Sequence, residues 1–372
     1  MAVEYRTIAS NRLDDLIVAL AEEAQVLAPV ERAAGDVLFS AIRTWDEMAR
    51  DYVNTDLPPK QFMLPQVEPM FRYHRNKGYE VEPVYDEQQR IIFGIRPCDV
   101  SAMLFLDLVF SADFPDVYYA RRRQKATLVA MTCDNPGENC FCTCADSGPA
   151  AEEGFDLQLT RLDGKFLVEI GSEEGSSIVN RHGNLFEAAS SEEIQYRLDH
   201  EERVMPKFKE ARSYFAQAIR RITTESVGDD LWHYVGDRCL ACGGCSYVCP
   251  TCFCFNVVDN PNGTSGTRCR TWDSCALAGF TRMAGGHNPR KQKQDRRNRR
   301  FYHKLAHYYI EKYGRHGCVG CGRCVLACPA GIDMPAVVKN MREFAGGEGI
   351  RLENGLWQIH STRGHTNPTH QE

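Results

Sequence analysis

Residues 239–250 read CLACGGCSYVCP, and residues 318–329 read CVGCGRCVLACP. In each stretch four cysteines follow one another with gaps of two, two and three residues, and a proline comes directly after the fourth. This is the bacterial-ferredoxin spacing for a [4Fe–4S] cluster, and where two such runs occur, the fourth cysteine binds the cluster of the other run. The sequence therefore predicts two [4Fe–4S] clusters, with the last cysteines of the two runs exchanged.

Zinc is the main alternative for these two runs, because paired CxxC units also form Cys₄ zinc sites. A zinc ribbon, however, needs only two cysteines in each half of its site, whereas each run here supplies four. Gly243 and Gly320 lie inside the loops and let the backbone bring its N–H groups close to cluster sulfurs. We therefore favour iron–sulfur clusters, with the predicted ligands Cys239, Cys242, Cys245, Cys249, Cys318, Cys321, Cys324 and Cys328.

Length and composition limit the class of protein. The 372 residues suffice for about two domains, and 43% hydrophobic residues allow a sizeable core. No segment approaches the roughly 20 uncharged apolar residues that a membrane span needs. The net charge of −6 becomes more negative when thiolates bind metal, which argues against nucleic-acid binding. An N-terminus without signal-peptide features and an odd number of cysteines, seventeen, predict a reducing, cytoplasmic location.

The first half of the chain alternates between helix-like and strand-like patterns. The patterns predict helices over 11–24 and 101–110, strands over 91–95 and 126–131, and a hairpin over 155–170. We expect Asn11 to cap the first helix and either Asp99 or Ser101 to cap the second. The order strand, helix, strand predicts an α/β domain with a parallel pair of strands in its sheet.

A third metal site is predicted at one edge of this sheet. Cys98 and Cys133 each follow the end of a predicted strand, and parallel strands bring such ends to the same edge. The loop after the second strand then returns with further cysteines. The alternative is a set of buried thiols without metal. The predicted ligands of this third [4Fe–4S] cluster are Cys98, Cys133, Cys140 and Cys142, and the spacing equally allows Cys144 in place of Cys142.

The second half is richer in helix formers. Segments 200–225 and 301–313 favour helices, and a further helix is expected over 334–344 after Asp333. We expect these helices to hold the two clusters in a helical-ferredoxin arrangement. The chain is thus predicted to be α+β overall, with an α/β domain over 1–205, a mainly helical two-cluster domain over 206–360, and a polar tail over 361–372.

Four cysteines between the two runs carry no ligand pattern. We interpret Cys252, Cys254, Cys269 and Cys275 as thiols that flank the clusters or pack in the core, and a further metal site is the alternative. The stretch PRKQKQDRRNRR (289–300) is strongly basic. A solvated basic face is the ordinary interpretation of such a run. Two functional interpretations are compensation of anionic clusters and an exposed rim of arginines that docks an acidic partner.

Nucleotide-binding motifs are missing from the sequence. No GxGxxG follows a strand, and there is no GxxxxGK[ST]. We therefore expect the chain to bind neither flavin nor nicotinamide, and to relay electrons between a donor and an acceptor on other subunits.

Several longer strings resemble one known family. They are RPCD (96–99), CFC (140–142) and GFDLQL (154–159) in the first half, and WDSC (272–275), FTRMAGGHNPR (280–290) and RRFYHK (299–304) in the second. With the two cysteine runs, they resemble the iron–sulfur beta subunit of sulfhydrogenase-type nickel–iron hydrogenases and the related iron–sulfur subunit of anaerobic sulfite reductase.

The resemblance implies an electron-transfer subunit of a cytoplasmic, multi-subunit oxidoreductase of anaerobic metabolism. One expected partner is a flavin subunit that handles NAD(P)H. The other is a catalytic partner, which could be a hydrogenase, a sulfite or sulfur reductase, or a heterodisulfide reductase. The chain itself would be a relay rather than the catalytic centre. Two alternatives remain: a self-contained iron–sulfur reductase of a sulfur compound, with a site near Cys252, Cys254 and Cys275, and a non-redox, metal-stabilised scaffold.

Overall fold

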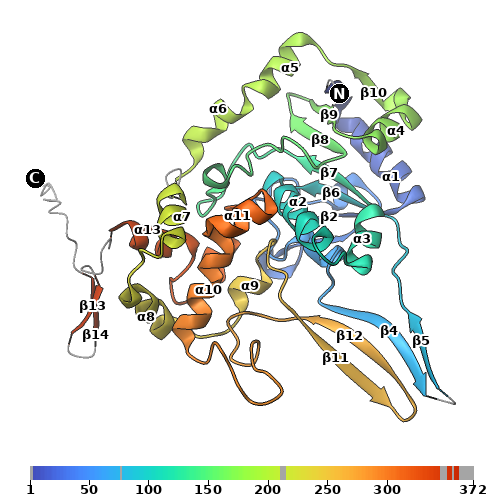
Figure 1. The fold of residues 1–372 in the computed structure, drawn as a ribbon. Helices are drawn as coiled ribbons and strands as arrows, with labels where there is room; N and C mark the ends of the chain where they lie inside the picture. The colour runs from blue at the N-terminus through green and yellow to red at the C-terminus, as the bar shows by residue number, and fades with distance from the viewer. Residues whose placement is uncertain (1–2, 76–77, 210–214, 344–349, 354–355, 360–372) are drawn as a thin grey trace, which may run out of the picture. The chain divides into compact units, whose positions relative to one another are not determined.

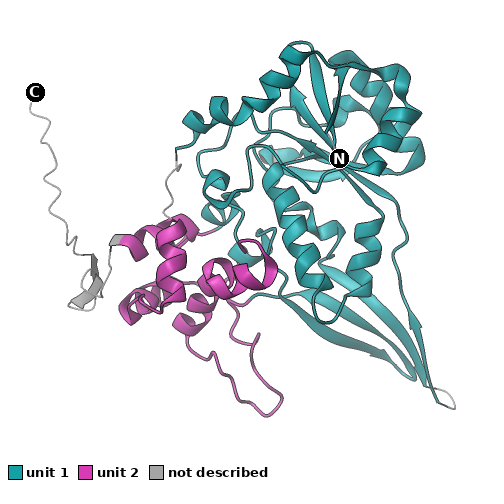
Figure 2. Cartoon of the chain, turned by 45° about the horizontal axis from the view of Figure 1, so that its top comes forward, with its two compact units in different colours: residues 1–212, 245–274, 318–327 teal, residues 213–244, 275–317, 328–372 magenta. Residues whose placement is uncertain are grey.

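The computed structural model describes residues 3–75, 78–209, 215–343, 350–353 and 356–359. Its contacts divide the chain into two units (Figure 2). Unit 1 comprises residues 1–212, 245–274 and 318–327, and unit 2 comprises residues 213–244, 275–317 and 328–372. This division differs from the two continuous domains expected from the sequence, because parts of both cysteine runs belong to unit 1. The predicted tail, 361–372, lies outside the described residues.

An eight-stranded mixed sheet forms the centre of unit 1 (Figure 1). The strands β2, β6, β7 and β8 are parallel to one another, and the remaining neighbours pair antiparallel. The predicted parallel pair is β6 and β7. In spatial order, the strands are β10 (Phe186–Ala188), β1 (Glu4–Ala9), β9 (Lys165–Ile170), β8 (Leu157–Arg161), β7 (Ala126–Met131), β6 (Arg90–Ile95), β2 (Gln25–Glu31) and β3 (Val37–Ala41).

Helices cover the two faces of this sheet. On one face α1 (Leu13–Glu23) and α4 (Glu173–Arg181) pack against alternate strand residues and form the main apolar core. On the other face lie α2 (Pro97–Ser111) and α3 (Val117–Gln124). After β10 the chain continues through α5 (Ser191–Leu198) and α6 (His200–Val204). The residue that precedes α1 is Arg12, so the predicted capping role of Asn11 is wrong.

Helix α2 begins directly behind β6. Its N-cap is Arg96, in extended conformation, and Pro97 occupies the first helical position, where its missing N–H is no loss. The prediction that Asp99 or Ser101 caps this helix is therefore wrong, because both residues lie inside it. Cys98 and Asp99 consequently point out of the first turn, at the carboxyl edge of the sheet.

A second sheet of unit 1 was not expected from the sequence. Its four antiparallel strands are β11 (Phe255–Asn262), β12 (Ser265–Trp272), β4 (Val67–Arg75) and β5 (Tyr79–Pro83), in that order. It joins a segment from between the two cysteine runs to the N-terminal part of the chain. A fully buried carboxylate, Glu68 on β4, accepts a 2.7 Å hydrogen bond from Arg270 on β12 and pairs with Arg122 on α3.

Unit 2 is mainly helical. Its helices are α7 (Phe215–Thr223), α8 (Asp229–Arg238), α10 (Lys293–Leu305), α11 (His307–Tyr313) and α13 (Met334–Glu343), and two further strands are β13 (Ile350–Glu353) and β14 (Leu356–Ile359). As predicted, a helix follows Asp333, whose carboxylate accepts a hydrogen bond from the Ala336 N–H at 3.0 Å. The α+β class is confirmed. None of the described helices is both long and apolar enough to cross a membrane.

Three arginines in the second half of the basic run differ from both exposed-face interpretations. Most of the run forms the first half of α10, where Arg296, Arg297 and Arg300 are each 5% exposed or less. The Arg296 guanidinium donates to the carbonyl oxygens of Ala276 and Lys291 at 3.0 and 2.6 Å. For these three arginines the expectation of a solvated face or an exposed docking rim is therefore wrong, whereas Lys291 and Lys293 at the start of the run are exposed.

Candidate metal centres

The structure brings together thiols from both halves of the sequence within unit 1. Cys98, Cys140 and Cys142 are buried in one cluster with Cys321 of the second cysteine run. They carry free thiols, and burial raises the pKa of each above the usual range, for Cys140 to about 11. Thiols held this way keep their protons until a metal displaces them, because metal ligation requires the thiolate.

Cys133 belongs to the same neighbourhood. It lies two residues after the end of β7 and is partly exposed. A negative charge on Cys133 would raise the pKa of both Cys140 and Cys142. Cys144 is absent from the buried cluster, although it is only two residues from Cys142. Of the two alternatives left open by the spacing, Cys142 is the one buried with Cys98 and Cys140, whereas Cys144, like Cys133, is partly exposed.

The loop that carries Cys140 and Cys142 is docked on the loop of the second cysteine run. The N–H of Phe141 donates to the carbonyl of Gly320 at 2.8 Å, and the Ser147 hydroxyl donates to the carbonyl of Val319 at 2.7 Å. Asn54 lies at the same junction. Its amide donates to the Cys321 carbonyl at 2.7 Å, and its oxygen accepts from the Cys98 thiol at 3.8 Å.

Gly320 is required for this close approach. Its φ is +58°, and a Cβ at this position would lie 2.5 Å from the Phe141 backbone. We expect Gly320→Ala to destabilise the protein by about 2–5 kcal/mol, from backbone strain plus the clash. Gly164→Ala is the matched control, because Gly164 shares the positive φ but faces open space; it should cost about 1–2 kcal/mol. Urea unfolding measures both, and equal losses would contradict the docking role.

An orphaned polar atom supports a metal group among these thiols. The Thr143 hydroxyl, between Cys142 and Cys144, is buried, and among the described residues it has no hydrogen-bond partner. A buried hydroxyl without a partner is costly. Thiolates and sulfides of a cluster accept such hydrogen bonds, so the residues present fit an iron–sulfur group.

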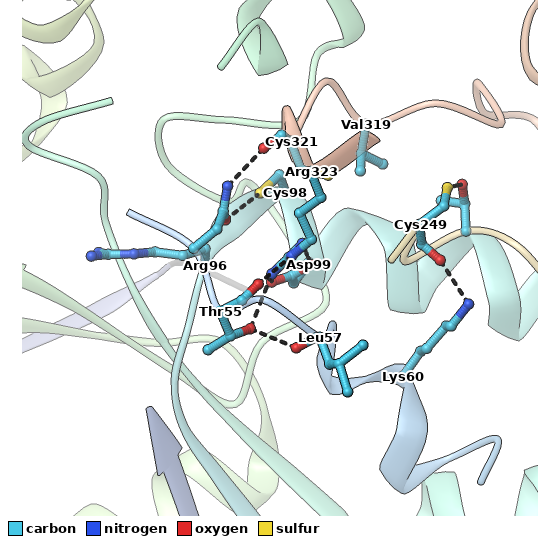
Figure 3. A network of polar contacts seen from close by, with 12 residues as sticks. Thr55, Leu57, Lys60, Arg96, Cys98, Asp99, Cys249, Val319, Cys321 and Arg323 are labelled. Carbon is cyan, nitrogen blue, oxygen red and sulfur yellow. Dashed lines mark hydrogen bonds and ion pairs between the residues drawn. The ribbon is translucent and has the colours of Figure 1, made fainter. Parts of the chain in front are cut away.

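A buried ion pair lies between the N-terminal thiols and the second run (Figure 3). Arg323 directly precedes Cys324, and its two terminal nitrogens donate to the two carboxylate oxygens of Asp99, each at 2.7 Å. The same guanidinium donates to the Thr55 carbonyl at 2.6 Å. Burial alone would lower the pKa of Arg323, but the adjacent Asp99 carboxylate raises it, so the guanidinium stays charged.

The fourth cysteine of the first run lies near the second run. Cys249 and Cys321 are close enough for a charge on Cys249 to raise the pKa of Cys321. The Cys249 sulfur is also 3.3 Å from the Thr251 hydroxyl. This arrangement within unit 1 supports the predicted exchange, in which Cys249 joins Cys318, Cys321 and Cys324.

Unit 2 contains a complementary arrangement. The Arg238 guanidinium donates to the Ala330 carbonyl at 2.9 Å and thereby links the residue before Cys239 to the turn after Cys328. Cys239 is buried, its sulfur accepts the Ala241 N–H at 3.3 Å, and its carbonyl accepts from Lys293 at 3.2 Å. These contacts support Cys328 as a ligand beside Cys239 and Cys242.

The four other cysteines have distinct surroundings. Cys269 is buried on β12 and accepts a 3.6 Å hydrogen bond from Asn260, as a packing residue would. Cys275 is also buried. The carbonyl of Cys252 accepts a hydrogen bond from Lys60, and that of Cys254 accepts one from the Asp273 N–H at 2.9 Å. Across the described residues, no group of three or more His, Cys, Asp or Glu side chains is arranged to hold a single metal ion. A four-iron cube makes a different demand, since its thiolates bind separate irons at its corners.

Sequence patterns gave no signal for several residues of these sites. Several polar side chains form hydrogen bonds between segments that are far apart in the chain: Asn54, Thr55, Lys60 and Arg323. No sequence motif predicts the partner of any of them. For Arg323, the only sequence signal is the spacing of the cysteines around it, which predicts a metal-binding loop but not the ion pair with Asp99.

Comparisons with known proteins agree with this picture. Residues 238–332, which span both cysteine runs, match the family model described as a 4Fe-4S dicluster domain. The chain is 33% identical over 342 residues to sulfhydrogenase 2 subunit beta of Pyrococcus furiosus, an alignment that covers 92% of this chain and 99% of that protein. The dicluster match confirms the prediction of iron–sulfur clusters in this region.

A solved structure of the F420-reducing [NiFe] hydrogenase complex from Methanosarcina barkeri is a more distant match. It has 11% sequence identity and a TM-score of 0.35, with 60% of this chain and 93% of that chain covered. Similarity at this level does not establish a shared fold. The match to the Pyrococcus protein, in contrast, extends along nearly the whole of both chains, and the chain therefore belongs to the family of sulfhydrogenase beta subunits.

Proposed function

We propose that this chain is an electron-transfer subunit that binds three [4Fe–4S] clusters. Bound clusters of this type accept and release single electrons. The chain contributes thiolate ligands, buried surroundings and fixed positions. The proposed ligand sets are Cys239, Cys242, Cys245 and Cys328 for the first cluster, Cys318, Cys321, Cys324 and Cys249 for the second, and Cys98, Cys133, Cys140 and Cys142 for the third.

The observation that carries this proposal is the burial of Cys321 together with Cys98, Cys140 and Cys142. A relay requires neighbouring clusters, and this shared burial supports a position of the proposed N-terminal cluster next to the second cluster. The second and first clusters are joined through Cys249 and Cys245, which are four residues apart in the chain. Together these relations support a path in the order third, second, first cluster.

The proposed partners follow from the family. The Pyrococcus relative is by its name one subunit of a sulfhydrogenase. We propose that this chain likewise assembles in the cytoplasm with a flavin subunit that handles NAD(P)H and with a catalytic redox subunit. Affinity purification of the tagged chain from its native cells, followed by mass spectrometry, should recover both; recovery of the chain alone would contradict the hetero-oligomer.

The third cluster is tested by substitution of one ligand. Cys98→Ser should lower the iron content of the anaerobically purified protein by about four irons per chain, one cube, because it removes a corner ligand. Cys269→Ser is the control, because Cys269 is a buried thiol on β12 outside the proposed sites. An iron content unchanged by Cys98→Ser would remove the third cluster from the proposal.

One cavity favours a second function, that of a reductase acting on a small sulfur compound. The cavity has a volume of about 170 Å³ and is lined by Arg96, Thr132, Asp134 and Arg161, among others. Its lining includes Thr132 and Asp134, the chain neighbours of Cys133, at the carboxyl edge of the parallel strands, where α/β sheets bind ligands. Reduction of sulfite or polysulfide by the isolated chain with an artificial electron donor would establish this function. The absence of turnover would leave electron transfer between other subunits as the function of the chain.

A further inference from the structure

A buried lysine contacts the end of the first cysteine run. Lys60 is 2% exposed and lies in a short 3₁₀ turn, Pro59–Phe62. Its ammonium group donates to the carbonyl oxygens of Cys249 and Cys252 at 2.7 and 2.8 Å, and it lies 3.5 Å from the Ser246 carbonyl (Figure 3 shows the Cys249 contact). All these residues belong to unit 1.

An aromatic ring completes the surroundings of this ammonium group. The Lys60 nitrogen is 4.3 Å from the centre of the Trp272 ring, at cation–π distance. The Trp272 indole donates to the Leu64 carbonyl at 2.8 Å, and the N–H of Leu64 donates to the Lys60 carbonyl at 2.7 Å. The lysine and the tryptophan are thus fixed by the same turn, so the ammonium group is held in place before any cofactor binds.

Three carbonyl oxygens surround the Lys60 nitrogen and match the three N–H donors of an ammonium group. Burial of an ammonium group is unfavourable and shifts lysine toward its neutral form unless negative charge compensates for it. A cluster ligated by Cys249, whose carbonyl Lys60 contacts, would bring an anionic group close to the buried cation.

We propose that Lys60 is a positioning residue that raises the reduction potential of the cluster ligated by Cys249. This inference rests on the ligand set of the second cluster proposed above. Reduction adds one electron, delivered by the neighbouring redox centre, to an already anionic group and breaks no bond. A fixed positive charge nearby stabilises the reduced form more than the oxidised form, and net charge and hydrogen bonding are known determinants of cluster potentials. The effect should be largest at the second cluster, because the two shortest contacts of Lys60 lie at Cys249 and Cys252, whereas the Ser246 carbonyl, next to the first-cluster ligand Cys245, is 3.5 Å away.

Three substitutions separate charge from hydrogen bonding and packing. Lys60→Met removes the charge and the donors, Lys60→Gln removes the charge but keeps an N–H donor, and Lys60→Arg keeps the charge. The readout is a potentiometric titration of the full-length, iron-loaded protein, followed by electron paramagnetic resonance. The other clusters in the same sample are the internal control.

The expected result is a lower midpoint potential of one cluster in the two neutral variants. At a fixed solution potential its reduced fraction, relative to the oxidised one, should fall about tenfold, which corresponds to about 59 mV for a one-electron couple. Lys60→Arg should remain close to wild type. Unchanged potentials in iron-loaded Lys60→Gln and Lys60→Met, or equal shifts in every cluster, would overturn the proposal.

If Lys60→Met and Lys60→Gln do not bind clusters, their potentials cannot be measured, and the iron content of the three variants is compared instead. Loading by Lys60→Arg alone would then support the requirement for charge, whereas failure of Lys60→Arg as well would show a purely steric role and overturn the proposal. The proposed function is tested separately by the wild-type protein. A wild type without iron would contradict the function itself, and an iron-loaded wild type with insensitive variants would contradict only the role of Lys60.

Discussion

Arg323→Met is expected to reduce the free energy of unfolding by about 3–5 kcal/mol, the usual cost of breaking a buried ion pair by removing one partner. The guanidinium makes two 2.7 Å hydrogen bonds to Asp99 and one 2.6 Å bond to Thr55. Without it, the Asp99 carboxylate stays buried with no cation beside it. Urea denaturation of the purified protein, monitored by far-ultraviolet circular dichroism, measures the loss.

The double variant Asp99→Leu/Arg323→Met separates the ion pair from other effects of the substitution. Replacement of both charged partners by apolar residues leaves no buried charge without compensation and is often close to neutral. We therefore expect the double variant to be more stable than Arg323→Met alone, with a large coupling between the two sites. A loss below about 1 kcal/mol for Arg323→Met, or additive losses in the double variant, would show that the pair does not hold the two segments together.

The double variant Cys249→Ser/Cys321→Ser is expected to lose about four irons per chain, as either single variant does. In the proposed arrangement both cysteines ligate the same cube. The first substitution already removes that cube, so the second substitution causes no further loss of iron. The structural basis is the proximity of Cys249 and Cys321 in unit 1. Iron and acid-labile sulfide analysis of anaerobically purified protein provides the measurement.

The double variant Cys245→Ser/Cys249→Ser gives the opposite expectation and is the matched control. These cysteines belong to the same run but, with exchanged ligands, to different cubes, so this variant should lose about eight irons. If each run instead binds its own cluster, the two results will be reversed. The pair of double variants therefore distinguishes exchanged from unexchanged ligands without a metal-bound structure.

Much of the central sheet could be predicted because its strands are buried on both faces. IIFGI and ATLVAM are continuous apolar runs, and they form β6 and β7 as a parallel pair. The hairpin around Gly164 was also predictable, because apolar alternation on both sides meets a residue suited to positive φ. The cysteine spacing predicted the iron–sulfur region for a comparable reason, since ligand geometry constrains the sequence locally.

The second sheet could not be found by the same patterns. Strand β11 is exposed along nearly its whole length, so its sequence, FNVVDNPN, shows no alternation of apolar and polar residues. The Asn262-Gly263 dipeptide is typical of a turn, but no apolar alternation precedes it. Strand β12 pairs with β4, and its Arg270 binds Glu68, which is far away in the chain. A buried ion pair of this kind produces no periodic pattern of apolar residues in the sequence.

The charged residues were misjudged for a related reason. A charged side chain is normally exposed, so Arg296 and Arg300 suggested a solvated surface and Asp99 suggested a helix cap. In the folded chain Arg296 binds backbone carbonyls and Asp99 binds Arg323. Burial of these groups depends on tertiary partners that the local sequence does not specify.

Metal analysis of the anaerobically purified wild-type protein tests the central claim most directly. Three [4Fe–4S] clusters require about twelve irons and as many acid-labile sulfides per chain, with a broad visible absorption that bleaches on reduction. We predict this result. A colourless protein that contains stoichiometric zinc and no sulfide would contradict the assignment of this chain as an electron-transfer subunit.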